Sequence, residues 1–415
     1  MTIVAMVCPV KVKPATCFSS AMPDAAQKSA FVAAQPGTQD EAMFCHRCLT
    51  PRTFPGSVFD AEGICMPCRY AEQWDAIDWV SRRRELEEIA DWGRTTSKSA
   101  WDCIIGVSGG KDSTRQAFYV RDELKMKPLL VSCSYPPEQQ TERGNTNLAN
   151  LAERGFDIHI VAPGPQTSKQ LMKYAFETWG NLFKASELAL YSCLPRAAIA
   201  FGIPLIFLGE NPGLNFGGFT GSFDGNANRL REANTLGGAE LEPWLAAGVP
   251  REMLYWYAYP SDADIRRADL RMIYLGYYMR DFNDTANTEF SLEHGLVPRK
   301  GIDARPEETG SLNPADALDD EFVHVNQHLK YLKLGFGKIT QQASVQIRRG
   351  VIDRQQGIDL VEMFDGKCSD RYINRLCGYL GVPRAVFDAR VEELRSKELW
   401  QMNNHGEWEL RYKLR

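Results

Sequence analysis

The chain has 415 residues, a hydrophobic content of 44%, a charged content of 24% and a net charge of −5. This length predicts two or three domains, and the acidic balance argues against a protein whose main partner is a nucleic acid. No apolar run reaches the roughly 18–20 residues that cross a bilayer, and Lys11 and Lys13 interrupt the apolar N-terminus. We therefore expect a cytoplasmic protein without a signal peptide or membrane insertion.

Residues 1–40 are rich in Ala, Ser, Pro, Gln and Thr and show no sustained periodicity. This composition predicts a disordered tail. The eleven cysteines of the chain are an odd number, and four of them fall in two C-x-x-C pairs. That pattern favours a metal site in a reducing compartment over a disulfide framework.

The two C-x-x-C pairs define a module over residues 41–70. Cys45 and Cys48 form the first pair, Cys65 and Cys68 the second, and 16 residues lie between Cys48 and Cys65. Thiolates two residues apart on a tight turn can share one tetrahedral ion, and two such turns complete its coordination. The spacing predicts a zinc-ribbon-like module with structural Zn²⁺, because four cysteines leave no open position for a substrate. His46 could replace one ligand, although a solvent-facing side chain is favoured.

A linking segment follows over residues 71–98. Apolar side chains recur at three- and four-residue intervals over 71–94, which predicts an amphipathic helix. Its basic run Arg82–Arg84 could contact phosphates, but a solvated helix face with partners at Glu87 and Glu88 is favoured.

The stretch 101–115, WDCIIGVSGGKDSTR, joins a short apolar strand to a helix through a glycine turn. The unpaired N–H groups of a helix N-terminus and its dipole attract anions, and glycines let the backbone approach an oxyanion closely. The residues predicted to make this anion site are Ser108, Gly109, Gly110, Lys111, Asp112 and Ser113. The Walker A spacing is absent. A glycine-rich turn without a ligand is the alternative.

An α/β domain is expected over residues 99–260, with strands at 102–107, 128–133, 157–161 and 204–209 and helices between them. This alternation predicts a parallel sheet, whose ligands lie beyond the carboxyl ends of the strands. Polar side chains follow those ends. They are Ser134 and Tyr135 for the adenine side, Asn145–Asn147 on the next turn and helix start, and Glu210 and Asn211 for a substrate or Mg²⁺. The alternatives are a helix cap for Asn147 and a turn for Asn211.

The remainder of the chain carries weaker signals. Glycines crowd residues 213–225, which predicts either a flexible lid or sugar-binding loop beside the site, or a surface excursion. Residues 261–415 are expected to be mainly helical, with another packing helix at 384–400. The basic and aromatic residues over Arg266–Arg280 could bind nucleic acid, but a packed helix with a charged outer face is favoured in this acidic chain. His324 and His328 are four residues apart and could ligate a metal, but no Glu follows His324, so the zincin pattern fails.

Several of these features together carry a family resemblance. The loop Ser108–Ser113 resembles the PP-loop of the N-type ATP pyrophosphatases. With the paired cysteines, Gly209–Pro212 and the stretch His328–Lys338, the chain is similar to the N-acetyl sugar amidotransferases of surface-polysaccharide (O-antigen, lipopolysaccharide) and nonulosonate synthesis. The resemblance covers roughly Phe44 to Asp365. It implies a PP-loop parallel sheet with an N-terminal zinc ribbon and a mainly helical C-terminal region.

The resemblance also implies a reaction. The oxygen of an acetamido sugar attacks ATP, pyrophosphate leaves, and ammonia then displaces AMP to give an acetamidine. Lys111 and the loop would hold pyrophosphate, Asp112 and Glu210 would hold Mg²⁺, and Ser134 and Asn211 would help to bind the nucleotide. The substrate would be a sugar nucleotide. The chain has no G-x-C-x-G elbow and no Cys after Met1, so ammonia would come from a separate glutaminase with an ammonia-channelling, cyclase-like subunit.

Two other functions remain open. A PP-loop tRNA sulfurtransferase would need a persulfide-bearing cysteine or an iron–sulfur cluster near the loop, and Cys133 and Cys193 are the candidates near strand ends. A zinc-ribbon scaffold protein would have lost catalysis, and the presence of Lys111, Asp112 and both loop serines argues against it.

Overall fold

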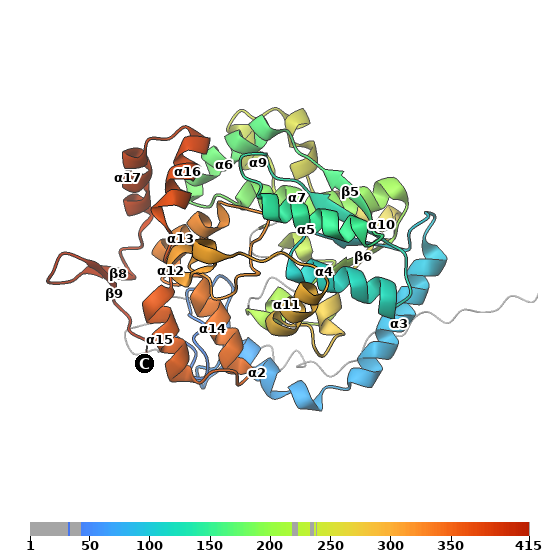
Figure 1. The fold of residues 1–415 in the computed structure, drawn as a ribbon, viewed down its shortest axis with the longest axis horizontal. Helices are drawn as coiled ribbons and strands as arrows, with labels where there is room; N and C mark the ends of the chain where they lie inside the picture. Colours follow the sequence, from blue (N-terminus) through green and yellow to red (C-terminus); the bar gives the residue numbers. More distant parts are fainter. Residues whose placement is uncertain (1–31, 34–42, 218–222, 233–235, 238, 415) are drawn as a thin grey trace, which may run out of the picture.

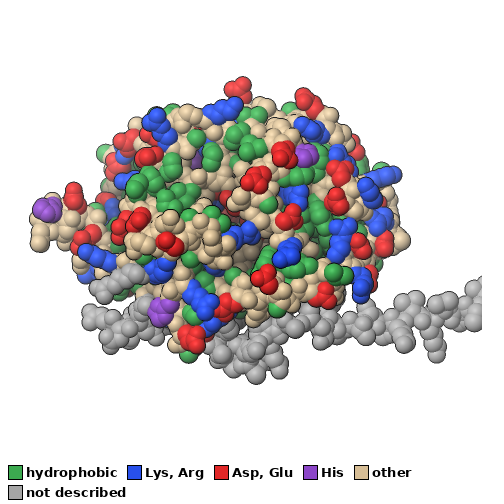
Figure 2. Space-filling model, turned by 60° about the horizontal axis from the view of Figure 1, so that its bottom comes forward, with side chains coloured by type: hydrophobic (Ala, Val, Ile, Leu, Met, Phe, Trp, Pro, Cys, Tyr) green, Lys and Arg blue, Asp and Glu red, His purple; other side chains and the backbone are tan. Residues whose placement is uncertain are grey.

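The computed structural model describes residues 32–33, 43–217, 223–232, 236–237 and 239–414. The predicted tail therefore lies almost wholly outside the described residues, as does the middle of the glycine-rich loop at 213–225. Within the described residues, no helix combines the length and the apolar character needed to span a membrane. Figure 2 shows acidic and basic side chains interspersed over the face that it presents, so neither sign of charge dominates that face.

A five-stranded parallel sheet forms the centre of the fold, in the order β5-β4-β3-β6-β7 (Figure 1). Strands β3, β4, β5 and β6 confirm the predicted parallel sheet, because each coincides with one of the short apolar runs. The strands are β1 (Val32–Ala33), β2 (Val58–Phe59), β3 (Cys103–Gly106), β4 (Pro128–Cys133), β5 (Asp157–Val161), β6 (Leu205–Leu208), β7 (Arg271–Tyr274), β8 (Trp400–Met402) and β9 (Trp408–Leu410).

The strand β7 corrects a prediction. The stretch that contains it is predicted to be a packed helix with a charged outer face, whereas Arg271–Tyr274 is an edge strand in register with Leu205–Leu208 of β6. Its residues Met272, Ile273 and Tyr274 are buried. Pairing with β6 therefore decides the conformation of this short segment, and the sheet continues past residue 260.

Helices surround the sheet, and α7 packs against β3, β4 and β6. The helices are α2 (Met66–Glu72), α3 (Trp79–Thr96), α4 (Lys111–Phe118), α5 (Glu142–Glu153), α6 (Pro165–Trp179), α7 (Lys184–Phe201), α8 (Pro212–Asn215), α9 (Glu242–Ala246), α10 (Asp262–Arg267), α11 (Asp284–Glu293), α12 (Pro306–Thr309), α13 (Val323–Leu334), α14 (Lys338–Arg348), α15 (Arg354–Phe364), α16 (Asp370–Leu380) and α17 (Arg384–Leu394).

The predicted helix over 71–94 is interrupted. Its first residues end α2, and α3 begins only at Trp79 because the Asp78 side chain accepts a hydrogen bond from the Ser81 N–H and caps the new helix. The favoured reading of its basic run is confirmed for Arg83, which pairs with Glu87 four residues later at 2.7 Å.

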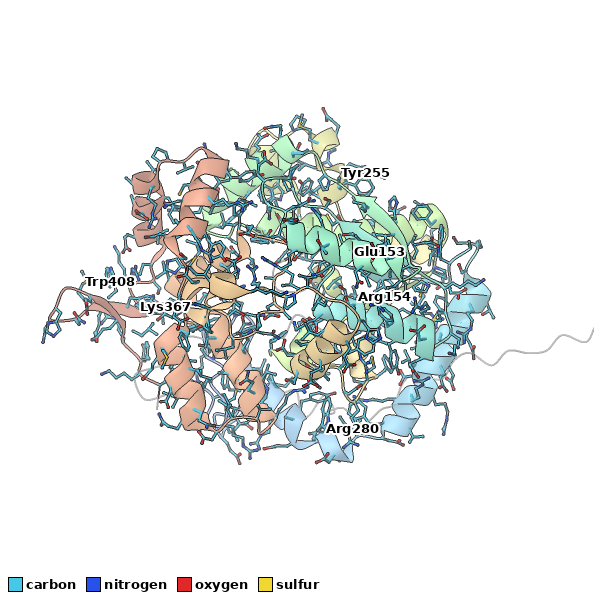
Figure 3. All side chains as sticks on the ribbon, viewed as in Figure 1. Glu153, Arg154, Tyr255, Arg280, Lys367 and Trp408 are labelled. Carbon is cyan, nitrogen blue, oxygen red and sulfur yellow. The ribbon has the colours of Figure 1, made fainter. Side chains whose placement is uncertain are left out.

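Two hydrophobic cores hold the fold together. The larger one is built on the sheet with α3, α4 and α7. The second joins Met172 and Phe176 of α6 to residues of α13, α16 and α17, and the rings of Phe176 and Phe387 stack at 5.0 Å. The C-terminal helices thus share a core with the α/β domain. By contrast, the β8–β9 hairpin projects from the body, and Trp408 lies on it (Figures 1 and 3).

Candidate active site and cysteine cluster

A cavity of ≈ 290 Å³ lies beyond the carboxyl ends of β3, β4 and β6. The strand order changes direction between β3 and β6, and such a switch point is where parallel sheets bind ligands. The glycine loop and a group of apolar side chains both line the cavity. Its lining residues include Val107, Ser108, Gly110, Asp112, Ser113, Gln116, Val131, Cys133, Leu190, Tyr191, Leu194, Leu208, Glu210, Leu230 and Tyr274.

The glycine loop has the predicted strand–turn–helix form. Gly110 precedes the first residue of α4 as its N-cap, and Ser113 donates a hydrogen bond to the Gly110 carbonyl at 3.1 Å. Gly109 has φ +74°, and a Cβ there would lie 3.0 Å from the Cβ of Asn147 and 3.1 Å from the Leu148 nitrogen. The loop is therefore pressed against α5, and only glycine suits this position.

Lys111 is enclosed by carboxylates. Its ammonium lies 2.6 Å from Asp316, 2.9 Å from Asp112 and 3.1 Å from Asp284, and the side chain is only 7% exposed. Burial opposes the charged form, yet the carboxylates of Asp316, Asp112 and Asp284 outweigh it and raise the pKa of Lys111 well above its ordinary value. Lys111 is thus a cation beside the glycine loop.

Asp316 connects this lysine to the C-terminal region. Its second oxygen lies 3.2 Å from Lys338 and accepts a hydrogen bond from Gln342 at 2.8 Å, both on α14. Arg299 fixes the loop by donating to the carbonyls of Asp316 and Ala317. Ala317 has φ +49°, a strained conformation for a residue with a side chain. The backbone is therefore held in a costly form next to Asp316.

Asp112 is held from a second direction by Asn287 of α11, which donates to its carboxylate at 2.8 Å. Helix α11 packs on α4. Asn287 and the carboxylates of Asp284 and Asp316 are absent from the sequence-based prediction. They lie on loops and helix starts without a local motif, so nothing short of the fold brings them to Lys111.

Glu210 and Asn211 follow β6 but behave differently. Glu210 lines the cavity together with Asp112. Burial and the charge of Asp112 raise the pKa of Glu210, and the ammonium groups of Lys111 and Lys338 oppose that rise. Two carboxylates in one cavity offer the oxygen ligands that Mg²⁺ prefers. Asn211 does not line the cavity, because its side chain caps α8 through the N–H groups of Gly213 and Leu214.

The other predicted polar residues lie outside the cavity lining. Ser134 accepts a hydrogen bond from Gln140, and its N–H donates to the Val161 carbonyl at 2.7 Å. Asn147 is buried and bonds to both the carbonyl and the N–H of Val297. It is therefore a link between α5 and the later chain, a role that was not among its predicted ones.

Gln116 adds a cavity residue that the sequence did not single out. It lies one turn into α4, is buried and lines the cavity. Its Oε1 has no hydrogen-bond partner among the described residues. A buried acceptor without a partner is costly, so this atom is available to a donor on a bound ligand.

The four predicted cysteine ligands form a compact cluster. Their sulfur atoms all lie within 4.8 Å of one another, and Cys45–Cys68 and Cys48–Cys65 are separated by 3.8 Å and 3.6 Å. A tetrahedral ion with Zn–S bonds of about 2.3 Å would place its sulfurs about 3.8 Å apart. The donor set and its spacing therefore fit zinc, with no open position. His46 is exposed and stands outside the cluster.

Arg348 ties the cysteine cluster to the active region. One of its guanidinium nitrogens lies 3.5 Å from the Cys48 sulfur, and the other donates to the Asn215 carbonyl at 2.6 Å. Asn215 ends α8, the helix that follows Glu210 and Asn211. Arg348 of α14 therefore bridges the module and the segment that carries a cavity residue.

His324 and His328 face backbone groups and do not share a ligand. The Nδ1 of His324 lies 2.9 Å from the Thr309 carbonyl, and that of His328 lies 2.7 Å from the Gly366 carbonyl. Among the described residues, the cysteine cluster is the one group of three or more His, Cys, Asp or Glu side chains close enough to hold a metal ion.

Comparisons with known proteins address the family. Residues 318–415 match the model for the C-terminal domain of WbpG-like LPS biosynthesis proteins. No curated protein matches the chain. Among solved structures, the NH₃-dependent NAD synthetase of Campylobacter jejuni is 15% identical, with 54% of this chain and 100% of that chain covered and a TM-score of 0.27. An NMN synthetase of Francisella tularensis is 12% identical, with 55% and 100% covered and a TM-score of 0.26.

The matched segment begins two residues after Asp316, which contacts Lys111, and it contains Lys338, which contacts Asp316. The match of residues 318–415 to the WbpG-like C-terminal domain supports the family resemblance that the motifs predict.

Proposed function

We propose that this protein is an ATP-dependent amidotransferase that converts the acetamido group of a nucleotide-linked sugar into an acetamidine. The observation that carries the proposal is the cavity at the switch point, which joins a glycine loop and helix N-terminus to an apolar pocket. This combination suits a nucleotide, with phosphates at the loop and the base among apolar side chains. The match to a lipopolysaccharide biosynthesis family supports a sugar-linked acceptor.

The reaction balances without a protein nucleophile. The amide oxygen of the sugar forms a bond to the α-phosphorus of ATP, and the bond from that phosphorus to the bridging oxygen breaks. Pyrophosphate leaves with the electron pair. Ammonia then adds to the activated carbon and loses protons, and AMP departs with the former amide oxygen. The protein contributes positioning and neutralisation of charge at the phosphates.

Each role falls to a described residue. The N–H groups at the start of α4 and the loop of Gly109 and Gly110 would receive the phosphates, and Lys111 would offset part of the negative charge of its neighbouring carboxylates. Asp112 and Glu210 would hold Mg²⁺, which supplies charge neutralisation to the phosphates. Gln116 Oε1 would accept a hydrogen bond from the nucleoside.

The cysteine cluster has a structural role in this proposal. Zn²⁺ held by Cys45, Cys48, Cys65 and Cys68 would fix the module against α14, where the Leu49 N–H donates to Ser344. A module of this size has too small a core to fold alone, so metal binding would supply its folding energy.

Ammonia would be delivered by a separate glutaminase together with a cyclase-like subunit that channels it. The test is copurification from the native cell, followed by activity with glutamine. Full activity of the isolated chain with glutamine as the only nitrogen source would contradict this arrangement.

The decisive experiment combines the protein with ATP, Mg²⁺, ammonium and a panel of nucleotide-linked acetamido sugars carrying ¹⁸O in the acetamido group. The proposal predicts sugar-dependent AMP and pyrophosphate, a product one mass unit lighter than the unlabelled sugar, and the ¹⁸O label in AMP. AMP formed only with tRNA would support the sulfurtransferase alternative. ADP and phosphate would contradict the PP-loop assignment, and the absence of ATP binding would support the scaffold alternative.

A further inference from the structure

The active region holds two lysines that differ in accessibility. The side chain of Lys111 is 7% exposed, and its ammonium lies against Asp112, Asp284 and Asp316. The side chain of Lys338 is 34% exposed. Within the described part of the chain, Asp316 is the one carboxylate within 4.0 Å of the Lys338 ammonium. Lys338 is therefore the cation of this pair that solvent, and hence a ligand, can reach.

The backbone at Lys338 is firmly seated. Lys338 is the first residue of α14, and the Asp365 carboxylate accepts hydrogen bonds from the Gly337 N–H at 2.7 Å and the Thr340 hydroxyl at 2.6 Å. A Cβ on Gly337 would lie 2.5 Å from Asp365. The helix start cannot shift without breaking this cap, so the flexible lysine stem extends from a fixed point.

Lys338 lies on the cavity side of the C-terminal region. Its partner Asp316 also contacts Lys111, which in turn contacts the cavity residue Asp112. Its charge also acts on Glu210, another cavity residue. The C-terminal domain thus presents a reachable cation to the site built by the α/β domain.

We propose that Lys338 is a second phosphate-binding residue, which contacts the β- and γ-phosphates of ATP and holds pyrophosphate as it leaves. This inference rests on the ATP use proposed above. When the bond between the α-phosphorus and the bridging oxygen breaks, the leaving pyrophosphate gains the electron pair. The Lys338 ammonium keeps its proton and stabilises that growing charge.

The test compares ligands that contain and lack these phosphates. Binding of MgATP, inorganic pyrophosphate and AMP is measured by calorimetry on the full chain, for the wild type, Lys338→Met, Lys338→Arg and Lys333→Met. Lys333 is the matched control, because it lies near the end of the preceding helix α13 and donates to the Trp179 carbonyl at 2.6 Å instead of contacting Asp316. The proposal predicts that Lys338→Met weakens ATP and pyrophosphate binding about 10- to 100-fold, or about 1.4–2.8 kcal/mol. AMP binding stays unchanged, Lys338→Arg recovers part of the loss, and Lys333→Met matches the wild type.

A second measurement needs no variant. Wild-type protein is labelled with an amine-reactive ester, and modified peptides are quantified by mass spectrometry. Pyrophosphate should protect Lys338 and AMP should not, while the exposed Lys367, labelled in Figure 3, reacts equally in both. Unchanged ATP and pyrophosphate binding in Lys338→Met, an equal loss of AMP binding, or no protection of Lys338 would each overturn the inference. Failure of the wild type to bind ATP would instead refute the proposed function itself.

Discussion

Asp316 offers the sharpest test of the network around Lys111. Replacement by Asn keeps the size of the side chain but removes its charge from Lys111 at 2.6 Å and from Lys338 at 3.2 Å. Leaving a buried charge without its partner costs about 3–5 kcal/mol. Lys111 keeps Asp112 and Asp284, and the Lys338 head reaches solvent. We therefore expect Asp316→Asn to lower the free energy of unfolding by ~2–3 kcal/mol, below the full cost of an orphaned charge.

The pH dependence of this loss follows from the carboxyl group. Burial alone would raise the pKa of Asp316, but Lys111 and Lys338 hold it well below its usual range. Its stabilising contribution is thus complete above the unfolded-state pKa of about 4 and is lost as the pH falls further towards the folded-state pKa. The difference between wild type and variant should be largest near about pH 7 and should shrink towards about pH 3.

Urea unfolding at several pH values measures both quantities. The control is Asp370→Asn, because Asp370 pairs with Arg384 at the surface and is 76% exposed, so its loss should stay below about 1 kcal/mol. A difference under about 0.5 kcal/mol for Asp316→Asn near neutral pH, or one that does not shrink in acid, would refute the reasoning.

Three further predictions concern the metal, the loop and a buried histidine. Cys65→Ser should abolish bound zinc, measured by atomic emission, and lower the thermal midpoint, whereas Cys368→Ser should retain the metal. Gly109→Ala should weaken ATP binding at least ~10-fold in calorimetry because its Cβ meets the backbone of α5, and Gly155→Ala, with φ +86° and open space, is the control that carries only the backbone strain. Burial and the nearby Arg299 lower the pKa of His324 to about 3. Because the unfolded chain protonates this imidazole near pH ~6.5, stability should fall as the pH drops from there to about 3, and His324→Gln should flatten that slope in urea titrations; equal slopes would contradict it.

Local patterns allowed the glycine loop and the cysteine cluster to be predicted. The apolar run of β3, the two glycines and Lys111 are contiguous, and each C-x-x-C turn is formed by its own residues. Interactions between distant segments could not be predicted in this way. Asp284 and Asp316 reach Lys111 of the glycine loop, and Lys338 reaches Asp316, only because segments far apart in the chain pack together.

The predictions that failed did so for the same reason, because contacts between distant segments decide the structure there. The tyrosines around β7 recur at helical spacing, and only the edge of β6 makes that segment a strand. Asn211 and Asn147 are polar residues near strand ends, as ligands would be, but they serve the backbone of α8 and of Val297. Residue type alone does not distinguish a side chain that binds substrate from one that forms hydrogen bonds with backbone groups of the chain.

The contact made by Arg348 links the cysteine module to the supply of zinc as well as to folding. A guanidinium that touches both the Cys48 sulfur of the predicted zinc site and the end of α8 makes the position of α8 depend on an intact cluster. Under zinc starvation, we expect loss of the ion to free Arg348 and loosen the segment after Glu210. The proposed reaction would then slow with the zinc available to the cell, before the sheet itself unfolds.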